Sequence, residues 1–233
     1  MCVRYTFHEP DQAMAAIAKA LAAKLAPLPE WVKPRFNVTL THVMPVVAAG
    51  AGGPELRPIR WGLVPFYERS KPQRKLLPNA KAETATSLAG FREAVARRRC
   101  LVPANGFYEW RTVGKLKCPH LFTLNDGEPF AFAGIWEPPV GDTPGSFGIL
   151  TTAPNALVAP IHNRMPVILT GDAMPRWMGN ESLAGAEYLA LTSPLAPALI
   201  RERPVSHYVS NSRHEGPECL APPAAEPPEL ALG

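Results

Sequence analysis

Residues 120–137 read HLFTLNDGEPFAFAGIWE. A run of aliphatic and aromatic residues at 120–124 and a second run at 129–137 flank the polar tetrapeptide NDGE. Apolar runs separated by a short stretch that contains Asn, Asp and Gly are typical of a β-hairpin. We therefore expect two antiparallel strands with their turn at residues 125–128, in a domain where β-structure predominates.

Further strand-like runs surround this stretch. They lie at 42–49, 56–65, 100–110 and 147–153. Two other stretches have apolar residues at helical spacing: 11–25, with Asp11 as its N-cap, and about 87–98, with Ser87 as its N-cap. The 28 prolines interrupt nearly every connection, which argues against long helices. The pattern predicts an α+β fold, a twisted, largely antiparallel sheet or barrel with a few peripheral helices.

Length and composition indicate one domain. A chain of 233 residues with 46% hydrophobic residues can bury one sizeable core. We find no apolar run of about 18 residues and no signal peptide, and therefore expect no membrane association. The cysteines are few, widely spaced and without a Cys-x-x-Cys pair, which favours a reduced, cytosolic protein without a structural zinc site. They are Cys2, Cys100, Cys118 and Cys219.

The charge is unevenly distributed. Residues 215–233 carry four acidic residues and no Lys or Arg, so residues 1–214 hold 24 basic and 16 acidic residues. We expect 215–233 to be a disordered, Pro-rich acidic tail and 1–214 to form the functional domain. The positive excess favours a polyanionic partner. Two basic clusters stand out, at 69–75 and 97–99, although the second also fits a solvated helix end.

Cys2 has chemistry that no internal cysteine offers. Removal of Met1 leaves a thiol and a free α-amine, and the reference pKa values of such groups, about 8.5 and about 8, leave a minority of each nucleophilic at neutral pH. A 1,2-aminothiol can attack an aldehyde through its nitrogen to give a Schiff base, which the thiol closes to a thiazolidine. Alternatively, the thiol attacks an acyl carbon with the amine as base, as in amino-terminal nucleophile hydrolases. A frayed terminal cysteine without function is the third interpretation.

Four polar stretches occur in order along the chain: MCVR at 1–4, NAKAET at 79–84, NGFYEW at 105–110 and IHNRMPV at 161–167. Together they resemble the SOS response-associated peptidase family, whose members process abasic sites in single-stranded DNA. Further stretches extend the resemblance over nearly the whole domain: FNVT at 36–39, RWGLVP at 60–65, LTTA at 150–153 and RPVSHYVSN at 203–211. The chain departs from the family pattern at Val3, where Gly is common, and at Thr39-Leu40, where Ala-Pro is common.

The resemblance implies that Cys2, Asn79, Glu109 and His162 form the catalytic site. Asn79 offers a neutral amide that can bind a sugar oxygen or the terminal amine, or it is a turn residue. Glu109 stands among aromatic residues, which should raise its pKa by desolvation and suit it to move protons when a carbinolamine loses water. The alternative is an outward-facing strand residue. His162 can protonate the sugar ring oxygen and expose the aldehyde, or it is a solvated loop histidine.

The same resemblance implies DNA contacts. Arg4 and Arg164 can each clamp a phosphate bidentately, or form a structural ion pair instead. Phe66 and Tyr67, expected to be exposed before the basic loop, can stack on bases, whereas Trp61 is expected in the core. Further candidate DNA-binding residues are Asn37, Lys81 and Thr151.

We therefore expect an enzyme that traps abasic sites in single-stranded DNA through a thiazolidine crosslink at Cys2, without a metal or organic cofactor. The peptidase label of the family implies removal of the residue before Cys2. We expect a cytoplasmic monomer that is associated with the nucleoid when bound to DNA. Two other classes stay open: a cysteine hydrolase that uses Cys2, Glu109 and His162 on an acyl substrate, and a noncatalytic module that binds intact and abasic single strands alike.

Overall fold

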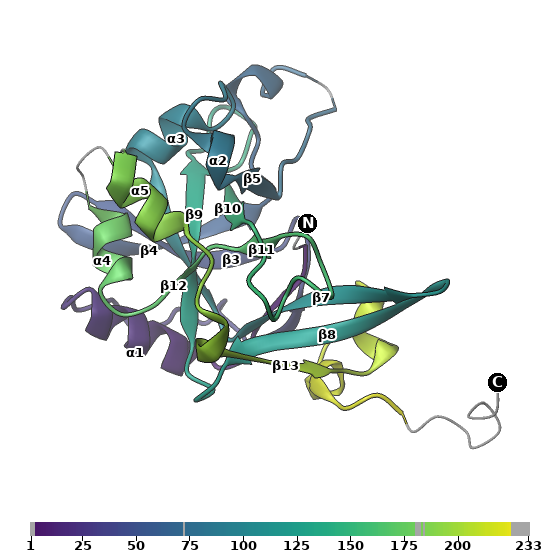
Figure 1. The fold of residues 1–233 in the computed structure, drawn as a ribbon. Helices are drawn as coiled ribbons and strands as arrows, with labels where there is room; N and C mark the ends of the chain where they lie inside the picture. Colours follow the sequence, from purple (N-terminus) through teal and green to yellow (C-terminus); the bar gives the residue numbers. More distant parts are fainter. Residues whose placement is uncertain (1–2, 72, 180–182, 184, 225–233) are drawn as a thin grey trace, which may run out of the picture.

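The described part of the chain folds into two β-sheets, with helices around the larger one (Figure 1). The computed structural model describes residues 3–71, 73–179, 183 and 185–224. The smaller sheet has, in spatial order, the strands β13 (Ile200–Pro204), β8 (Leu116–Leu124), β7 (Gly106–Val113), β1 (Tyr5–Phe7) and β2 (Arg35–Val38). The larger sheet has β11 (Met165–Pro166), β10 (Ser146–Thr152), β4 (Gly53–Trp61), β3 (Val43–Gly50), β6 (Arg99–Ala104), β9 (Phe130–Glu137) and β12 (Ile168–Leu169), with β5 (Asn79–Lys81) beside β10.

The larger sheet closes on itself. β10 pairs with β4 on one side and with β9 on the other, so β10, β4, β3, β6 and β9 form a ring. Most pairings are antiparallel, whereas β10 runs parallel to β4 and β5. The main core contains fully buried aromatic side chains, including Trp61, Phe132 and Phe147. The expected α+β class with a largely antiparallel sheet or barrel is confirmed, as is the core position of Trp61.

The expected hairpin over 120–137 is wrong, although both of its strands exist. β8 pairs with β7 and β13 in the smaller sheet, while β9 pairs with β6, β10 and β12 in the larger one. Both runs are apolar and mostly buried, so each fits the interior of a sheet with partners on both sides. The turn after Leu124, where the Asn125 amide donates to the Leu199 carbonyl oxygen, leads the chain from one sheet to the other.

A second change of sheet occurs at Asn105. The run 100–110 forms two strands instead of one, because β6 belongs to the larger sheet and β7 to the smaller. The Asn105 side chain holds this corner: Oδ1 accepts from the Glu9 amide at 3.1 Å, and Nδ2 donates to Glu9 Oε2 at 3.2 Å. The corner carries β7, and Glu109 with it, out of the barrel and into the smaller sheet.

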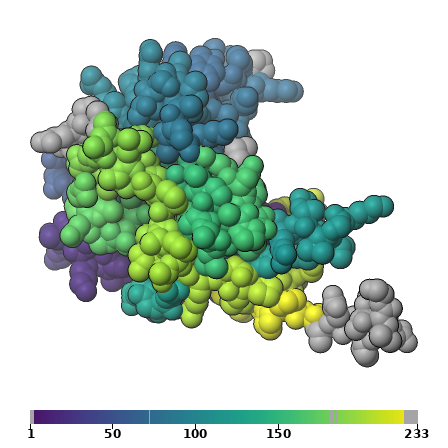
Figure 2. Space-filling view, in the orientation of Figure 1, coloured from purple at the N-terminus to yellow at the C-terminus, as the bar shows by residue number. Residues whose placement is uncertain are grey.

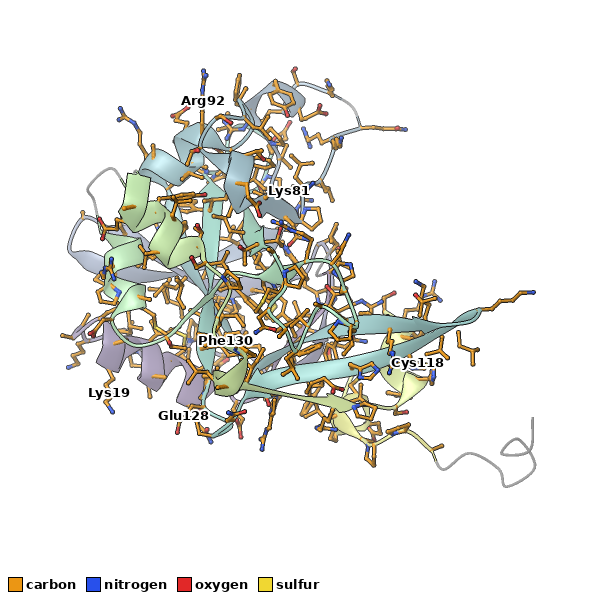
Figure 3. The ribbon with its side chains drawn as sticks, in the orientation of Figure 1. Lys19, Lys81, Arg92, Cys118, Glu128 and Phe130 are labelled. Atoms are coloured by element: carbon orange, nitrogen blue, oxygen red, sulfur yellow. The ribbon has the colours of Figure 1, made fainter. Side chains whose placement is uncertain are left out.

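β7 and β8 together form a long hairpin at the side of the molecule. They pair from Phe107–Phe122 to Val113–Leu116, and Gly114 in their turn has a positive φ of 58°. Figure 2 shows this hairpin projecting from the rounded body, and Figure 3 labels Cys118 on it. The hairpin and the body therefore meet near the middle of β7.

The helices differ from expectation at their ends. They are α1 (Pro10–Ala20), α2 (Ala82–Ala85), α3 (Arg92–Arg97), α4 (Ala173–Met178), α5 (Gly185–Thr192), and the 3₁₀ helices η1 (Phe66–Glu68), η2 (Pro197–Leu199), η3 (His207–Ser210) and η4 (Pro217–Leu220). α1 lies almost wholly within 11–25, but its N-cap is Glu9 and not Asp11, because a proline follows Glu9 in the first turn. The helix expected at 87–98 is shorter and consists of α3 alone. Ser87 is not its N-cap, because the Ser87 side chain donates to the Thr84 carbonyl oxygen in the turn after α2. None of the helices in the described ranges is long and apolar enough to cross a membrane.

Residues 215–224 differ from the tail that their composition suggested. η4 packs on the smaller sheet with Cys219 fully buried. Glu215 accepts hydrogen bonds from the amides of Phe36 and Asn37 on β2. These contacts anchor the Pro-rich segment as far as η4. The remainder of the expected tail, residues 225–233, lies outside the described residues.

Candidate active site

A buried carboxyl group lies near the point where the projecting hairpin meets the body. Glu109 on β7 stands opposite His120 of β8 and is only 4% exposed. Burial raises the pKa of Glu109 to about 7, while the positive charge of the amino terminus and a hydrogen bond from the Trp110 main chain act in the opposite direction. Oε1 has no hydrogen-bond partner within the described residues. The carboxyl group can therefore take up or release a proton at neutral pH, as its aromatic neighbours suggested.

His162 approaches this carboxyl group from the loop between β10 and β11. Its Nδ1 atom lies 3.7 Å from Oε1 of Glu109. The Arg164 amide donates to Nδ1 at 3.1 Å, and the Arg164 carbonyl oxygen lies 2.9 Å from the same atom. When Nδ1 carries no proton, it accepts from the Arg164 amide, and when Nδ1 is protonated, it donates to the Arg164 carbonyl oxygen. His162 can therefore exchange a proton without moving. Burial lowers the pKa of His162 more than the hydrogen bond to Arg164 raises it, which favours the neutral ring at pH 7.

A cleft of about 650 Å³ contains both groups. Its lining residues are Glu109, Trp110, Lys115, Leu116, Lys117, His162, His207 and Ser210. Apart from Glu109, the charged members are basic, which suits an anionic ligand. A second cavity, of about 580 Å³, lies among α2, α3 and α5 and includes neither Glu109 nor His162. The first cleft is therefore the candidate active site.

Sequence reasoning missed several residues of this cleft. Trp110 lies in the NGFYEW motif, and His207 and Ser210 lie in RPVSHYVSN, so the motifs themselves were the available signal. Lys115 and Lys117 sit near the turn of the projecting hairpin, outside any motif. Only the fold brings them to the cleft.

Further candidates gather around the strand pair β5 and β10. Asn79 and Lys81 belong to β5, and Lys81 pairs with Thr151 of β10. Arg164 donates to the Thr151 carbonyl oxygen at 2.5 Å and to the two carboxylate oxygens of Glu83 at 2.6 and 2.8 Å. Asn79 and Thr151 are buried, whereas Lys81 is exposed just before α2 (Figure 3). Because Arg164 follows the histidine of the cleft by two residues, this group adjoins the cleft.

Arg4 and Asn37 bind within the protein. Arg4 donates to Oδ1 of Asn37 at 2.9 Å, to the Val209 carbonyl oxygen at 2.7 Å and to that of Ser210 at 3.3 Å. These bonds favour a structural role for Arg4 over the phosphate clamp. Asn37 is fully buried, so its side chain does not support the direct DNA contact that we expected.

The two basic clusters are largely paired. Glu137, at the end of β9, accepts from Arg69 at 2.7 Å and from Arg98 at 2.8 Å. Arg99 is buried and donates to main-chain carbonyl oxygens, among them that of Trp177 at 2.7 Å. The clusters therefore present less unpaired positive charge than the sequence suggested.

Two aromatic side chains of η1 are open to solvent. Phe66 is 58% exposed and Tyr67 is 46% exposed, and their rings meet edge to face with centroids 5.4 Å apart. The expected exposure of both residues is confirmed. Aromatic faces at a surface suit base stacking, so their contact with DNA stays a prediction.

Cys2 lies outside the described residues, but the residues that follow it are placed. Tyr5 pairs with Phe107, and the Tyr108 amide donates to the Arg4 carbonyl oxygen at 3.1 Å. From Tyr5 back to Val3, the chain therefore runs beside β7 in the direction of Glu109. Val3 is 36% exposed.

Comparison with known proteins identifies the family. The model of the SOS response associated peptidase (SRAP) family matches residues 1–212. The chain belongs to the SRAP family. A relative from Bacillus subtilis, the abasic site processing protein YoqW, is 32% identical over 80% of this chain and 85% of its own length. The abasic site processing protein HMCES of Rattus norvegicus is 30% identical over 95% of this chain and 76% of its own length.

The fold of this SRAP chain also has a counterpart among solved structures. A crystal structure of a protein from Bacteroides thetaiotaomicron matches with a TM-score of 0.79 at 24% sequence identity, covering 96% of this chain and all of the other. At this level of identity the match concerns the fold alone.

Proposed function

We propose that this SRAP protein processes abasic sites in single-stranded DNA by forming a covalent crosslink through Cys2. The observation that carries the proposal is the Glu109–His162 pair in a basic cleft to which the start of the chain leads. Two Cα steps separate Arg4 from Cys2, so their Cα atoms are within about 7.6 Å of each other. Tyr108, the residue before Glu109, is bonded to Arg4 through its amide. These distances support contact between Cys2 and the acid–base pair.

The chemistry needs both nucleophiles of Cys2 once Met1 has been removed. The α-amine adds to the aldehyde carbon of the ring-opened sugar, and the resulting carbinolamine loses its hydroxyl group as water to give a Schiff base. The thiol then adds its sulfur to that carbon and its proton to the nitrogen, which closes the thiazolidine. Glu109, with its pKa near 7, donates the proton that leaves with the water.

His162 serves an earlier step. An abasic sugar hides its aldehyde in a closed hemiacetal, and opening requires a proton on the ring oxygen. His162 exchanges that proton while Arg164 keeps the imidazole in place. Asn79 contributes a neutral amide toward the sugar or the amine, as the NAKAET motif implies.

The strand is guided by contacts beside the cleft. Arg164 and Lys81 bind phosphates, and Phe66 and Tyr67 stack on bases. Thr151 acts indirectly, because its carbonyl oxygen orients Arg164. The peptidase activity of the family is limited here to removal of the residue before Cys2. We expect the protein to act as a cytoplasmic monomer, at the nucleoid when it is bound.

A denaturing gel of the protein with a single strand containing one abasic site tests the proposal. The wild-type protein should give a heat-stable adduct, and the intact strand none. Cys2→Ala should lose that adduct but keep a Schiff base that borohydride traps, since its amine remains. An uncleaved residue before Cys2 should also abolish the heat-stable adduct, because it converts the Cys2 amine to an amide.

Other results separate the competing functions. A heat-stable adduct in Cys2→Ala without reductant excludes the thiazolidine. Equal noncovalent binding of intact and abasic strands, with no adduct, identifies a binding module. Turnover of an acyl substrate without any DNA adduct identifies a hydrolase.

A further inference from the structure

The start of the chain is fastened to a segment near the other end of the described residues. Arg4 donates to the carbonyl oxygen of Val209, 205 residues further along. The buried Asn37 accepts from Arg4 through Oδ1, while its Nδ2 atom donates to carbonyl oxygens at 3.2, 3.0 and 2.9 Å. Those three carbonyls belong to Val209, Asn211 and His214. We call residues 205–221, which include η3 and η4, the C-terminal clamp.

The C-terminal clamp also completes the edge of the smaller sheet. Among the described strands β2 is the last of that sheet, so its outward amides have no described strand to bond. Glu215 supplies the acceptor, because its Oε1 atom accepts from the amides of Phe36 and Asn37. On the neighbouring side, Trp110 of β7 donates to Ser210 Oγ at 3.0 Å. The clamp thus bridges β2 and β7, the two strands that flank β1.

The clamp supports a short strand. β1 is three residues long and pairs with β7 at Tyr5 and Thr6 and with β2 at Tyr5 and Phe7. A terminal strand of this length frays unless it is tied down. The clamp ties it through the side chain of Arg4, which only Val3 separates from Cys2.

We infer that the C-terminal clamp positions Cys2 for attack on its aldehyde substrate, with Arg4, Asn37 and Glu215 as its positioning residues. The inference rests on the proposed function, in which Cys2 is the nucleophile. Covalent capture depends on orientation, since a displacement of about 1 Å can slow an enzymatic reaction about a hundredfold. Arg4 is half-buried and its guanidinium donates to oxygens of the protein, so its loss should change the rate of capture and not the binding of the strand.

The chain offers matched variants for a test. Glu215→Ala removes the acceptor for the β2 amides, Glu215→Gln retains an acceptor oxygen, and Glu218→Ala removes an exposed carboxylate from the same segment. The measurements are the single-turnover rate of crosslinking at saturating abasic strand, the Kd for an intact strand, and hydrogen exchange of the amides of β1.

Glu215→Ala and Arg4→Met should lower the saturating rate by about tenfold or more and leave the Kd for intact DNA within about twofold of wild type. Glu215→Gln should restore most of the rate, and Glu218→Ala should match wild type. β1 amides should exchange faster in Glu215→Ala, whereas β9 amides should not change.

The inference fails if Glu215→Ala lowers thermal stability but keeps the saturating rate and the β1 protection of wild type. A lower salt dependence in Arg4→Met with an unchanged saturating rate also overturns it, because that pattern belongs to a phosphate ligand. Failure of the proposed function looks different, since the wild-type protein then gives no adduct. In that case, hydrogen exchange of the β1 amides in Glu215→Ala still decides whether the clamp holds the start of the chain. Exchange equal to that of wild type refutes this holding role.

Discussion

The Nδ1 atom of His162 lies 3.7 Å from Oε1 of Glu109 and bonds to the main chain of Arg164 instead. The two groups are therefore neighbours without being locked into one hydrogen-bonded unit. Each can exchange its proton with a different atom of the substrate. This arrangement supports a division of labour in which His162 opens the sugar and Glu109 assists loss of water.

Single-turnover rates on two substrates should separate these roles. His162→Ala should slow crosslinking to a natural abasic site by about a hundredfold, while sparing a substrate whose aldehyde cannot cyclise. Glu109→Ala should slow both, because both pass through a carbinolamine. Equal slowing of the two substrates by His162→Ala contradicts the assignment.

The pH dependence of crosslinking should report Glu109. Its pKa of about 7 means that the proton donor is lost as pH rises through neutrality, while the free amine increases. We expect a bell-shaped profile whose alkaline limb disappears in Glu109→Gln, together with a rate loss of about a hundredfold. If the alkaline limb near pH 7 persists in Glu109→Gln, that limb reports the titration of another group.

The same carboxyl group should make stability depend on pH. Because its pKa is higher in the folded protein, the unfolded chain loses this proton first, and Glu109 lowers the unfolding free energy progressively between about pH 4.5 and 7. Glu109→Gln removes this effect, so the variant should gain about 3 kcal/mol relative to wild type at pH 8 and little at pH 4.5. Urea unfolding of both proteins at the two pH values measures the difference. An equal difference at both values shows that packing and not titration is responsible.

Salt titrations should reveal the contact of Arg164 with the strand. Its guanidinium holds Glu83 in a bidentate pair, which lowers the pKa of Glu83. If a phosphate replaces that carboxylate, Arg164→Gln should reduce the logarithmic salt slope for intact single strands by about 0.7, and Glu83→Gln should tighten binding. Arg176→Gln, which breaks the exposed pair with Glu187 on α4 and α5, is the matched control. A slope that changes equally in the control indicates only a general loss of charge.

The loop before β3 carries a strained residue that a stability measurement can detect. Thr41 has a φ of 71°, a conformation that β-branched residues rarely adopt, and it is exposed. Thr41→Gly should raise the unfolding free energy by about 0.5–1 kcal/mol, because relief of strain exceeds the entropy that glycine adds to the unfolded chain. Thr39→Gly in the same loop is the control, since Thr39 has no positive φ to relieve and its replacement should destabilise the protein. Urea unfolding of the two variants measures both effects, and a loss of stability in Thr41→Gly contradicts the prediction.

The sequence predicted what depends on local pattern. Apolar runs located most strands, the helical spacing located α1, and the aromatic neighbours of Glu109 predicted its burial and raised pKa. The pairing partners of the strands were harder to predict, because the apolar pattern of 120–124 fits pairing with β7 as well as pairing with β9. The break at Asn105 was hidden for a similar reason, since its side chain bonds Glu9, 96 residues away.

The roles of several charged residues also depend on distant partners. Arg69 and Arg98 belong to the two clusters whose positive charge stood out in the sequence, but the fold pairs both with Glu137. Arg4 binds main-chain carbonyl groups, which every residue possesses, so no motif could reveal that partner. Position along the sequence says little about such bonds, because they form only between segments that the fold brings together.

The bond between Arg4 and Val209 has a consequence for the order of events during synthesis. At roughly 5–20 residues per second, a ribosome needs on the order of 10–40 s to make the 205 residues that separate them. Until then the start of the nascent chain can bond to Asn37 and Tyr108 but not to Val209. If the C-terminal clamp positions Cys2 as we infer, that residue is the first part of the site to be made and the last to be set in place.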